Sequence, residues 1–364
     1  MTERSAYDAF HDVPAAPRTT RGWNVYGKGI DRVGRDGMPE EFPVAAPAPD
    51  QLLVRVDAVG LCFSDVKLIR QGGEHAKLYG RDLEREPTRL GHEAAVTVVA
   101  VGDELRARFR PGQRLVIQPD IYVNGRSTAY GYTIPGGLIG YHLIGREVLA
   151  ADDGAYVIPV PDDMGYADAA LSEPWATVEA AYSQRRRVVP ADGGRTLVVA
   201  RAGDARPYQI DGVIAKAREV VRASDDVPAG PFDDIVMLGA RSAALVSRAA
   251  DALAFRGVLN LVTDAPLDGP VNIDVGRIHY HYTAFVGTSE HDAALAYGEA
   301  RNRTELRRAG VTVVVGAAGP MGQMPLERAL RVSGSSRSRA RPDVGSSWWP
   351  ATVPPRSARR PAAA

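Results

Sequence analysis

Three widely separated residues have side chains suited to holding a metal ion. Cys62 lies in a GLCFSD segment, His92 in a GHE segment and Glu173 in an SEPW segment. Zinc accepts thiolate, imidazole and carboxylate ligands because it is a borderline-soft cation. A catalytic zinc has three protein ligands and leaves a fourth position open for water or substrate. Together the three segments predict a catalytic zinc site.

Ser64 follows the cysteine by two residues and adds a proton-carrying group to this site. Bound zinc lowers the pKa of an alcohol or water and polarises a carbonyl as a Lewis acid. A hydroxyl beside the metal is then placed to relay the proton of a substrate hydroxyl group. We therefore count Ser64 among the predicted catalytic residues.

Other interpretations of these residues remain open. A lone cysteine is commonly a small buried apolar residue, and a histidine followed by a glutamate is a common surface or core pair. Cys62 and His92 are also the residue types of a thiol nucleophile and its base. A thiol enzyme predicts that Cys62 reacts with an alkylating agent whether or not a chelator is present, whereas metal ligation predicts protection by zinc.

Composition limits the class of protein. The chain has 364 residues, enough for two domains, with 45% hydrophobic and 24% charged residues, as in globular proteins. Its formal net charge is zero, which provides no long-range field for nucleic acid or a membrane surface, so neither is an expected partner. The single cysteine excludes an intramolecular disulfide and a four-cysteine structural zinc site. Without a leader pattern or a long apolar run, we expect a cytoplasmic location.

Residue patterns divide the chain into two kinds of structure. Residues 1–45 are polar and turn-rich, and alternating apolar residues then predict short strands followed by a helix over 168–182. From 195 onward, strands alternate with helices, which indicates a parallel sheet with crossover helices. The predicted strands of the first part start at Gln51 and span 93–102 and 110–119; those of the second part span 195–200, 232–240, 257–265, 282–288 and 311–316, with helices over 242–255 and 291–308.

The motifs around the three ligands resemble those of the zinc-binding medium-chain dehydrogenase/reductase superfamily, closest to its sorbitol- and sorbose-phosphate-dehydrogenase-like branch. The resemblance spans about residues 50–320 and includes the RPGQRLV segment that starts at Arg110 and the VGRIHY segment that starts at Val275. It implies a GroES-like β-barrel catalytic domain followed by a Rossmann-like domain. The family's structural zinc lobe is absent, and a Gly- and Tyr-rich stretch near 119–140, which we interpret as a loop rather than a substrate cleft, takes its place.

The same resemblance implies roles for single residues. Glu173 becomes the third zinc ligand, with Cys62 and His92. Glu93 becomes an alternative ligand or an inner neighbour of the metal, because either carboxylate is able to approach it. Ser64 becomes the proton relay, and Asp65 becomes a structural capping residue.

A nicotinamide nucleotide, NAD or NADP, is the cofactor that the family fold implies, but its binding motif is atypical. The strand at 195–200 is followed by no triple-glycine turn. A better match lies at Gly316, Gly319 and Gly322, which follow a predicted strand and precede a helical run, as phosphate binding at a helix N-terminus requires. No second strand ending in a ribose-binding acid follows. The nucleotide fold is then either permuted, with strands 235–288 completing the sheet, or truncated.

We therefore predict an α/β protein with three parts. Residues 1–182 form the GroES-like domain with one catalytic zinc, and residues 183–332 form an atypical or incomplete Rossmann-like domain. The Arg-, Pro- and Ser-rich residues 333–364 form a disordered tail, with out-of-frame translation and a real interaction tail as the two interpretations. The predicted function is interconversion of a secondary alcohol (a polyol, sugar or cyclitol) and a ketone by a homodimer or homotetramer, the alternative being a non-catalytic relic that cannot bind the cofactor.

Overall fold

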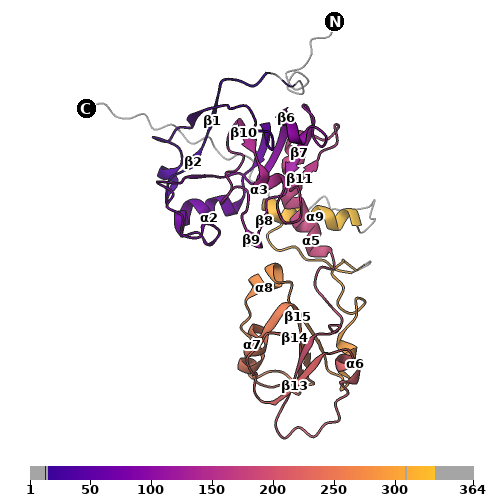
Figure 1. The fold of residues 1–364 in the computed structure, drawn as a ribbon. Coiled ribbons are helices and arrows are strands. Elements are labelled where there is room, and N and C mark those ends of the chain that lie inside the picture. The colour runs from indigo at the N-terminus through magenta and orange to yellow at the C-terminus, as the bar shows by residue number, and fades with distance from the viewer. Residues whose placement is uncertain (1–12, 14, 308–309, 333–364) are drawn as a thin grey trace, which may run out of the picture. The chain divides into compact units, whose positions relative to one another are not determined.

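The computed structural model describes residues 13, 15–307 and 310–332. The predicted tail at 333–364 therefore lies outside the described residues. Two compact units divide between Thr177 and Val178, close to the boundary expected after residue 182 (Figure 1).

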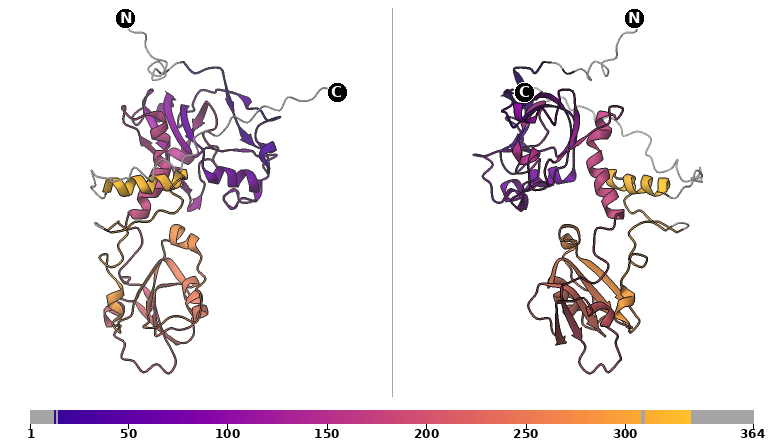
Figure 2. Two further views of the ribbon diagram at one scale, coloured as in Figure 1. Left: turned by 180° about the vertical axis from the view of Figure 1, so that it is seen from behind. Right: turned by 45° about the vertical axis from the view of Figure 1, so that its right-hand side comes forward.

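The first unit is built from antiparallel strands. Its main sheet has the order β10-β4-β6-β7-β11. The views in Figure 2 show these strands curling around a common interior, as the predicted barrel requires. The strand bounds are β10 (Tyr141–Ile144), β4 (Leu52–Gly60), β6 (Glu93–Val101), β7 (Arg114–Ile117) and β11 (Val157–Pro159), with three further pairs, β1 (Thr19–Gly22) with β3 (Glu40–Pro43), β2 (Asn24–Val25) with β5 (Thr88–Arg89), and β8 (Tyr122–Val123) with β9 (Arg126–Ser127).

The three strands predicted in this unit are confirmed, but the other eight described strands, β1 and β3 among them, were missed. β1 and β3 pair within the region that we expected to be turn-rich. Their residues alternate between buried or half-buried and exposed, and four residues are too few to stand out against polar surroundings.

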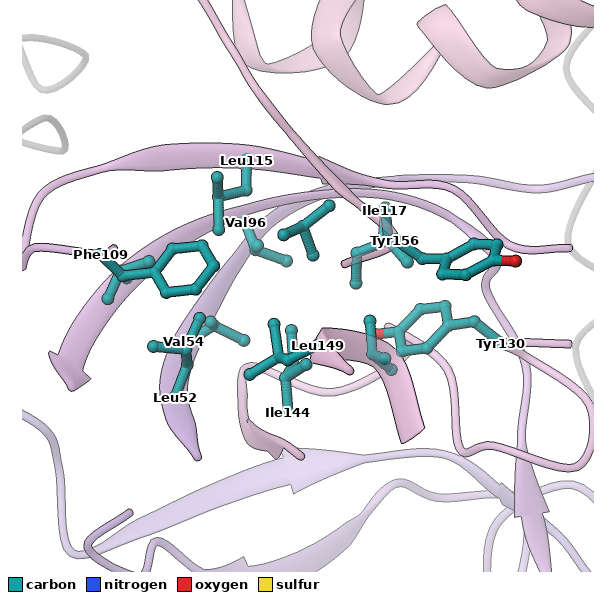
Figure 3. Packing of buried hydrophobic residues seen from close by; sticks show 14 of the residues in the cluster. Leu52, Val54, Val96, Phe109, Leu115, Ile117, Tyr130, Ile144, Leu149 and Tyr156 are labelled. Carbon is teal, nitrogen blue, oxygen red and sulfur yellow. The ribbon is translucent and has the colours of Figure 1, made fainter. Parts of the chain in front are cut away.

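A single apolar core fills the interior of the barrel (Figure 3). Leu52 and Val54 of β4 face Val96 of β6 and Leu115 of β7, and all four are at most 1% exposed. Side chains alternate between the two faces of a strand, so the inward positions are apolar. This packing fixes the ends of β4 and β6, where the candidate site lies.

Short helices connect and follow the strands of the first unit. The predicted helix over 168–182 is divided at Leu171 into two helices. Pro174 is the third residue of the second helix, within the first turn, where its missing N–H leaves no hydrogen bond unmade. The bounds are α2 (Phe63–Gln71), α3 (Arg146–Leu149), α4 (Tyr166–Ala170) and α5 (Ser172–Tyr182), with 3-10 turns η1 (Ile30–Arg32), η2 (Gly72–Glu74), η3 (Ala76–Leu78) and η4 (Asp103–Leu105).

The second unit contains a five-stranded sheet in which every pairing is parallel. The order is β13-β12-β14-β15-β16, so the predicted Rossmann-like sheet is confirmed. Phe232, Ile235 and Met237 of β14 are fully buried in its core, as expected for a central strand covered on both faces. The elements are β12 (Arg195–Ala200), α6 (Asp211–Ile214), β13 (Glu219–Ser224), β14 (Phe232–Leu238), α7 (Ala243–Asp251), β15 (Leu253–Val262), α8 (Val275–Tyr280), β16 (Ala284–Thr288), η5 (Ala293–Ala296) and α9 (Pro320–Val332).

Two predictions in this unit are wrong. The helix expected over 291–308 is reduced to the single 3-10 turn η5. The strand expected over 311–316 is absent, and Val311, Val313 and Val315 are 79–95% exposed. Alternating valines favour a strand only when a neighbouring strand pairs with them, and none of the described strands does. The permuted sheet, which needed this strand, is therefore wrong as well.

No helix within the described residues is long and apolar enough to span a lipid bilayer.

Candidate metal centre

Antiparallel pairing of β4 and β6 creates the candidate site. Gly60, the last residue of β4, lies opposite Glu93, the first residue of β6. Cys62 just after one strand and His92 just before the other are therefore brought to the same end of the sheet. Ligand atoms of Cys62, His92 and Glu93 all lie within 4.8 Å of one another.

The Glu93 carboxylate lies directly against the backbone of Gly60. A β-carbon added at Gly60 would be only 1.9 Å from Glu93 Oε2. A larger residue at this position would make the Glu93 carboxylate shift from its present place. The glycine thus permits the close approach of Glu93 to the end of β4.

Glu173 is not part of this close group. It lies in the first turn of α5, and the three ligand atoms that meet within 4.8 Å come from other residues. Burial raises the pKa of Glu173. Glu173 also interacts electrostatically with the group, because His92 lowers this pKa and Glu93 raises it further. The close group therefore contains Glu93, the alternative ligand, and the assignment of Glu173 as a ligand remains a prediction.

Asp65 holds the two halves of the site together. The backbone N–H of Cys62 donates to Asp65 Oδ2 at 2.9 Å, and that of Gly91 donates to Oδ1 at 3.3 Å. His92 Nδ1 lies 3.6 Å from Asp65 Oδ1. The capping role expected for Asp65 at the start of α2 is confirmed, and the same carboxylate faces the imidazole.

The electrostatics of the site favour a bound cation. Burial raises the pKa of Glu93, as it does that of Glu173, because buried carboxylates lack the solvation that stabilises their charge. Burial lowers the pKa of His92, but its interactions with Asp65 and Cys62 outweigh this and raise it to about 10. When ionised, three carboxylates and a thiolate beside one imidazole form a negatively charged group that a divalent cation would compensate.

Two polar atoms of the site are buried without a hydrogen-bond partner, Ser64 Oγ and His92 Nδ1. Leaving such atoms unpaired costs about 1–3 kcal/mol each. The Ser64 hydroxyl is thus available to a substrate hydroxyl, while His92 Nδ1 faces Asp65, which leaves the other ring nitrogen for a zinc ion.

Tyr132 forms part of the site and was missed in the sequence. Its ring centroid lies 5.8 Å from that of His92 and 5.2 Å from that of His75, and Lys77 Nζ lies 5.6 Å from it. Burial raises the Tyr132 pKa, and the nearby Ser64 hydroxyl lowers it. Tyr132 comes from the Gly- and Tyr-rich stretch near 119–140, whose aromatic content was the available signal. The stretch is largely a loop, as interpreted, and this loop contributes the buried Tyr132 beside His92.

No described strand directly precedes the three glycines proposed to bind nucleotide. Gly316 occupies a turn with a φ of 78°, and Gly322 lies inside α9. The helical run after the motif is present, but the strand that should precede it is not. Cofactor binding by Gly316, Gly319 and Gly322 remains a prediction without the expected strand.

Known proteins give an independent view of this chain. Residues 48–162 match the family described as the alcohol dehydrogenase GroES-like domain. L-sorbose 1-phosphate reductase of Klebsiella pneumoniae is 28% identical over 75% of this chain and 76% of its own length. The uncharacterized protein YggP of Escherichia coli (strain K12) is 30% identical over 73% of this chain and 72% of its own length. The chain belongs to the medium-chain dehydrogenase/reductase superfamily.

Within this superfamily the sorbitol-dehydrogenase-like branch is the one indicated. The sorbitol dehydrogenase of Bombyx mori is 28% identical over 80% of this chain and 77% of its own length. The GroES-like domain and the branch expected from the motifs are both confirmed. The chain is thus an oxidoreductase that acts on alcohols.

Metal-free protein provides a test of the contact between Cys62 and His92. The hydrogen bond from His92 is the main reason that the Cys62 pKa lies below its ordinary value of 9.0. A lowered pKa means that the thiolate forms at lower pH, so alkylation of Cys62 should reach half its maximal rate below pH 9.0. The measurement is the pH profile of alkylation by mass spectrometry after removal of metal.

His92→Ala is the matched variant for this experiment and should move the midpoint upward. A midpoint at or above 9.0 in the metal-free parent protein would contradict the placement of the imidazole beside the thiol.

Proposed function

We propose that this chain is a zinc-dependent dehydrogenase that interconverts a secondary alcohol and a ketone, with NAD(P) as hydride acceptor. The observation that carries the proposal is the group of Cys62, His92 and Glu93, whose ligand atoms lie within 4.8 Å of one another. Thiolate, imidazole and carboxylate are together suited to zinc, and three ligands leave one position open.

The chain's own residues would divide the work of the reaction. A zinc ion held by the three ligands would polarise the substrate C–O bond and lower the pKa of its hydroxyl group. Ser64 Oγ, buried and without a partner, is placed to accept that proton and pass it on. Asp65 keeps His92 oriented, and the carboxylate of Glu173 adds negative charge that favours the cation.

We propose a polyol, sugar or cyclitol as the substrate class. Relatives of this chain are named for sorbitol and for L-sorbose 1-phosphate. The surroundings of Tyr132 are consistent with a substrate of this kind, because His75 and Lys77 lie against its ring and offer hydrogen-bonding groups. Lys77 also pairs with Asp120 at 2.7 Å, which holds its ammonium group in place.

The nicotinamide part of the proposal rests on membership of the dehydrogenase family. The residues after β12, where a parallel sheet of this type holds a dinucleotide, do not fit the group. They contain Gly203 alone in place of a glycine-rich turn, and α6 that follows has only four residues. No step of the reaction is therefore derived through the nucleotide.

This misfit favours a second candidate, a protein that keeps the metal site but does not turn over substrate. The two candidates differ in whether purified protein oxidises polyols when NAD or NADP is supplied. Metal binding alone does not distinguish them, because both retain Cys62, His92 and Glu93.

Metal content is the first test of the proposal. We expect about one zinc per chain in the purified protein, measured by plasma mass spectrometry. Chelation should remove it together with any polyol dehydrogenation and should expose Cys62 to alkylation, which added zinc should reverse. A protein that contains no zinc and binds none would contradict the proposal, and alkylation of Cys62 that is indifferent to zinc would favour a thiol enzyme instead.

A further inference from the structure

The carboxyl end of the parallel sheet is where a ligand would be expected in the second unit. The strand order β13-β12-β14-β15-β16 places a topological switch point between β12 and β14. Sheets of this kind bind dinucleotides in the crevice outside the carboxyl ends of the two strands at that point. The turn after β12 normally supplies free backbone N–H groups to the pyrophosphate.

In this chain three backbone donors of that turn are already used. The N–H of Ala202 donates to Asp225 Oδ2 at 3.0 Å, and that of Asp204 donates to the Arg201 carbonyl at 3.2 Å. The N–H of Arg206 donates to Asp204 Oδ1 at 3.3 Å, and the next residue is Pro207, which has no N–H.

The Asp204 carboxylate occupies the space beside the end of β14. A β-carbon added at Gly239, the first residue after that strand, would lie 2.1 Å from Asp204 Oδ2 and 2.7 Å from the Tyr208 hydroxyl oxygen. The Asp204 side chain is only 4% exposed. The close approach that a glycine permits at this position is thus made by a carboxylate of the chain itself.

Asp204 is held there by charge-assisted hydrogen bonds. Arg206 donates through Nε to Oδ1 at 2.8 Å and through Nη2 to Oδ2 at 2.5 Å, and the Tyr208 hydroxyl donates to Oδ2 at 3.0 Å. Bidentate pairs of this kind are the stronger ion pairs in proteins. A phosphate entering the crevice would meet a carboxylate of like charge.

The same arginine extends the network across the sheet edge. Arg206 Nη1 lies 2.7 Å from Asp264 Oδ1, and Arg241 Nη2 donates to the same oxygen at 2.8 Å. Arg241 also donates to the hydroxyl of Thr263. The turns after β12, β14 and β15 are thereby tied together by one continuous ion-pair network, comprising Asp204, Arg206, Tyr208, Arg241 and Asp264.

Asp225, directly after β13, completes the closure. An acid at the end of the second strand is the residue type that binds the ribose of a nucleotide. Here its Oδ2 accepts the N–H of Ala202. The acid therefore braces the turn after β12.

We infer that this ion-pair network closes the crevice between β12 and β14, and that no dinucleotide binds there. A nicotinamide nucleotide used by this chain is held outside that crevice. The inference concerns only the second unit and holds whether or not the proposed zinc chemistry occurs.

Hydrogen exchange of the full chain, read by mass spectrometry, tests the closure. Arg206→Ala should speed exchange over residues 201–208 and 239–241. The control is Arg195→Ala, at the start of β12, which removes an ion pair with Glu219. It should leave the exchange rate of those segments unchanged. Equal exchange in Arg206→Ala and the parent would show that the network does not close the turn and would overturn the inference.

Nucleotide affinity gives the second readout, with NADH and NADPH as probes in calorimetry. A pyrophosphate in the crevice would contact Arg206, so its loss would weaken binding by about tenfold or more. We expect both variants to bind NADH and NADPH with the affinity of the parent protein, or none of the three proteins to bind either nucleotide. A selective tenfold loss in Arg206→Ala would overturn the inference, while zinc content and Cys62 protection would continue to report on the proposed function separately.

Discussion

Replacing Glu93 with alanine is expected to abolish zinc binding, whereas Glu173→Ala should retain the metal with an affinity lowered by about 10–100-fold. The ligand atoms of Glu93, Cys62 and His92 lie within 4.8 Å of one another, while Glu173 acts on them through its charge. Removing a ligand leaves too few groups to hold the ion, but removing a neighbouring charge only tunes it. Zinc content after dialysis against a graded chelator series measures both variants.

Glu93→Gln and Glu173→Gln serve as size-matched controls, because each keeps the side-chain volume and removes the charge. Loss of zinc in Glu173→Ala with retention in Glu93→Ala would favour Glu173 over Glu93 as the third ligand. Unchanged circular dichroism at the assay temperature would show that the barrel remains folded in each variant.

Ser64→Ala is expected to lower kcat by about 10²-fold or more while leaving zinc content unchanged. Ser64 Oγ is buried, so the substitution removes a proton-transfer group from the interior of the site. The measurement is steady-state polyol oxidation with NAD and NADP, with KM and kcat determined separately across pH.

A conservative variant separates proton transfer from structure. Ser64→Thr keeps the hydroxyl group and should recover much of the lost kcat, and added small-molecule buffer should partly rescue Ser64→Ala. A change confined to KM, or zinc lost together with activity, would contradict a relay role for Ser64.

The barrel and the residues of its site were largely predictable because their signals are local. β4 and β6 are short, mostly apolar segments bounded by turn residues, a pattern written in consecutive residues. The motifs that contain Cys62 and His92 adjoin those strands, so correct strands already place the two side chains near each other.

The choice between Glu93 and Glu173 was not available from such patterns. It depends on the register that sets Gly60 opposite Glu93, and a shift by one residue would turn that carboxylate to the other face. Register follows from long-range pairing, which a single sequence does not display.

In the second unit, by contrast, a segment with a strong strand pattern forms no strand, because none of the described strands pairs with it. The valines of 311–316 satisfy every strand criterion but remain exposed, while β13, with a mostly exposed edge pattern, pairs along its whole length with β12. Strand formation at a sheet edge is decided by an available neighbour more than by composition. Asp225 was missed for the same reason, since its role depends on recognising β13 first.

Zinc bound where β4 and β6 meet would also make the stability of the first unit depend on the concentration of free zinc. Cys62 and His92 mark the two ends of an intervening loop, so an ion that binds both acts as a reversible cross-link across it. Because an unfolded chain does not present these ligands together, the free energy of unfolding should rise with the logarithm of free zinc concentration. Zinc scarcity would then lower the fraction of folded protein as well as the activity of the site.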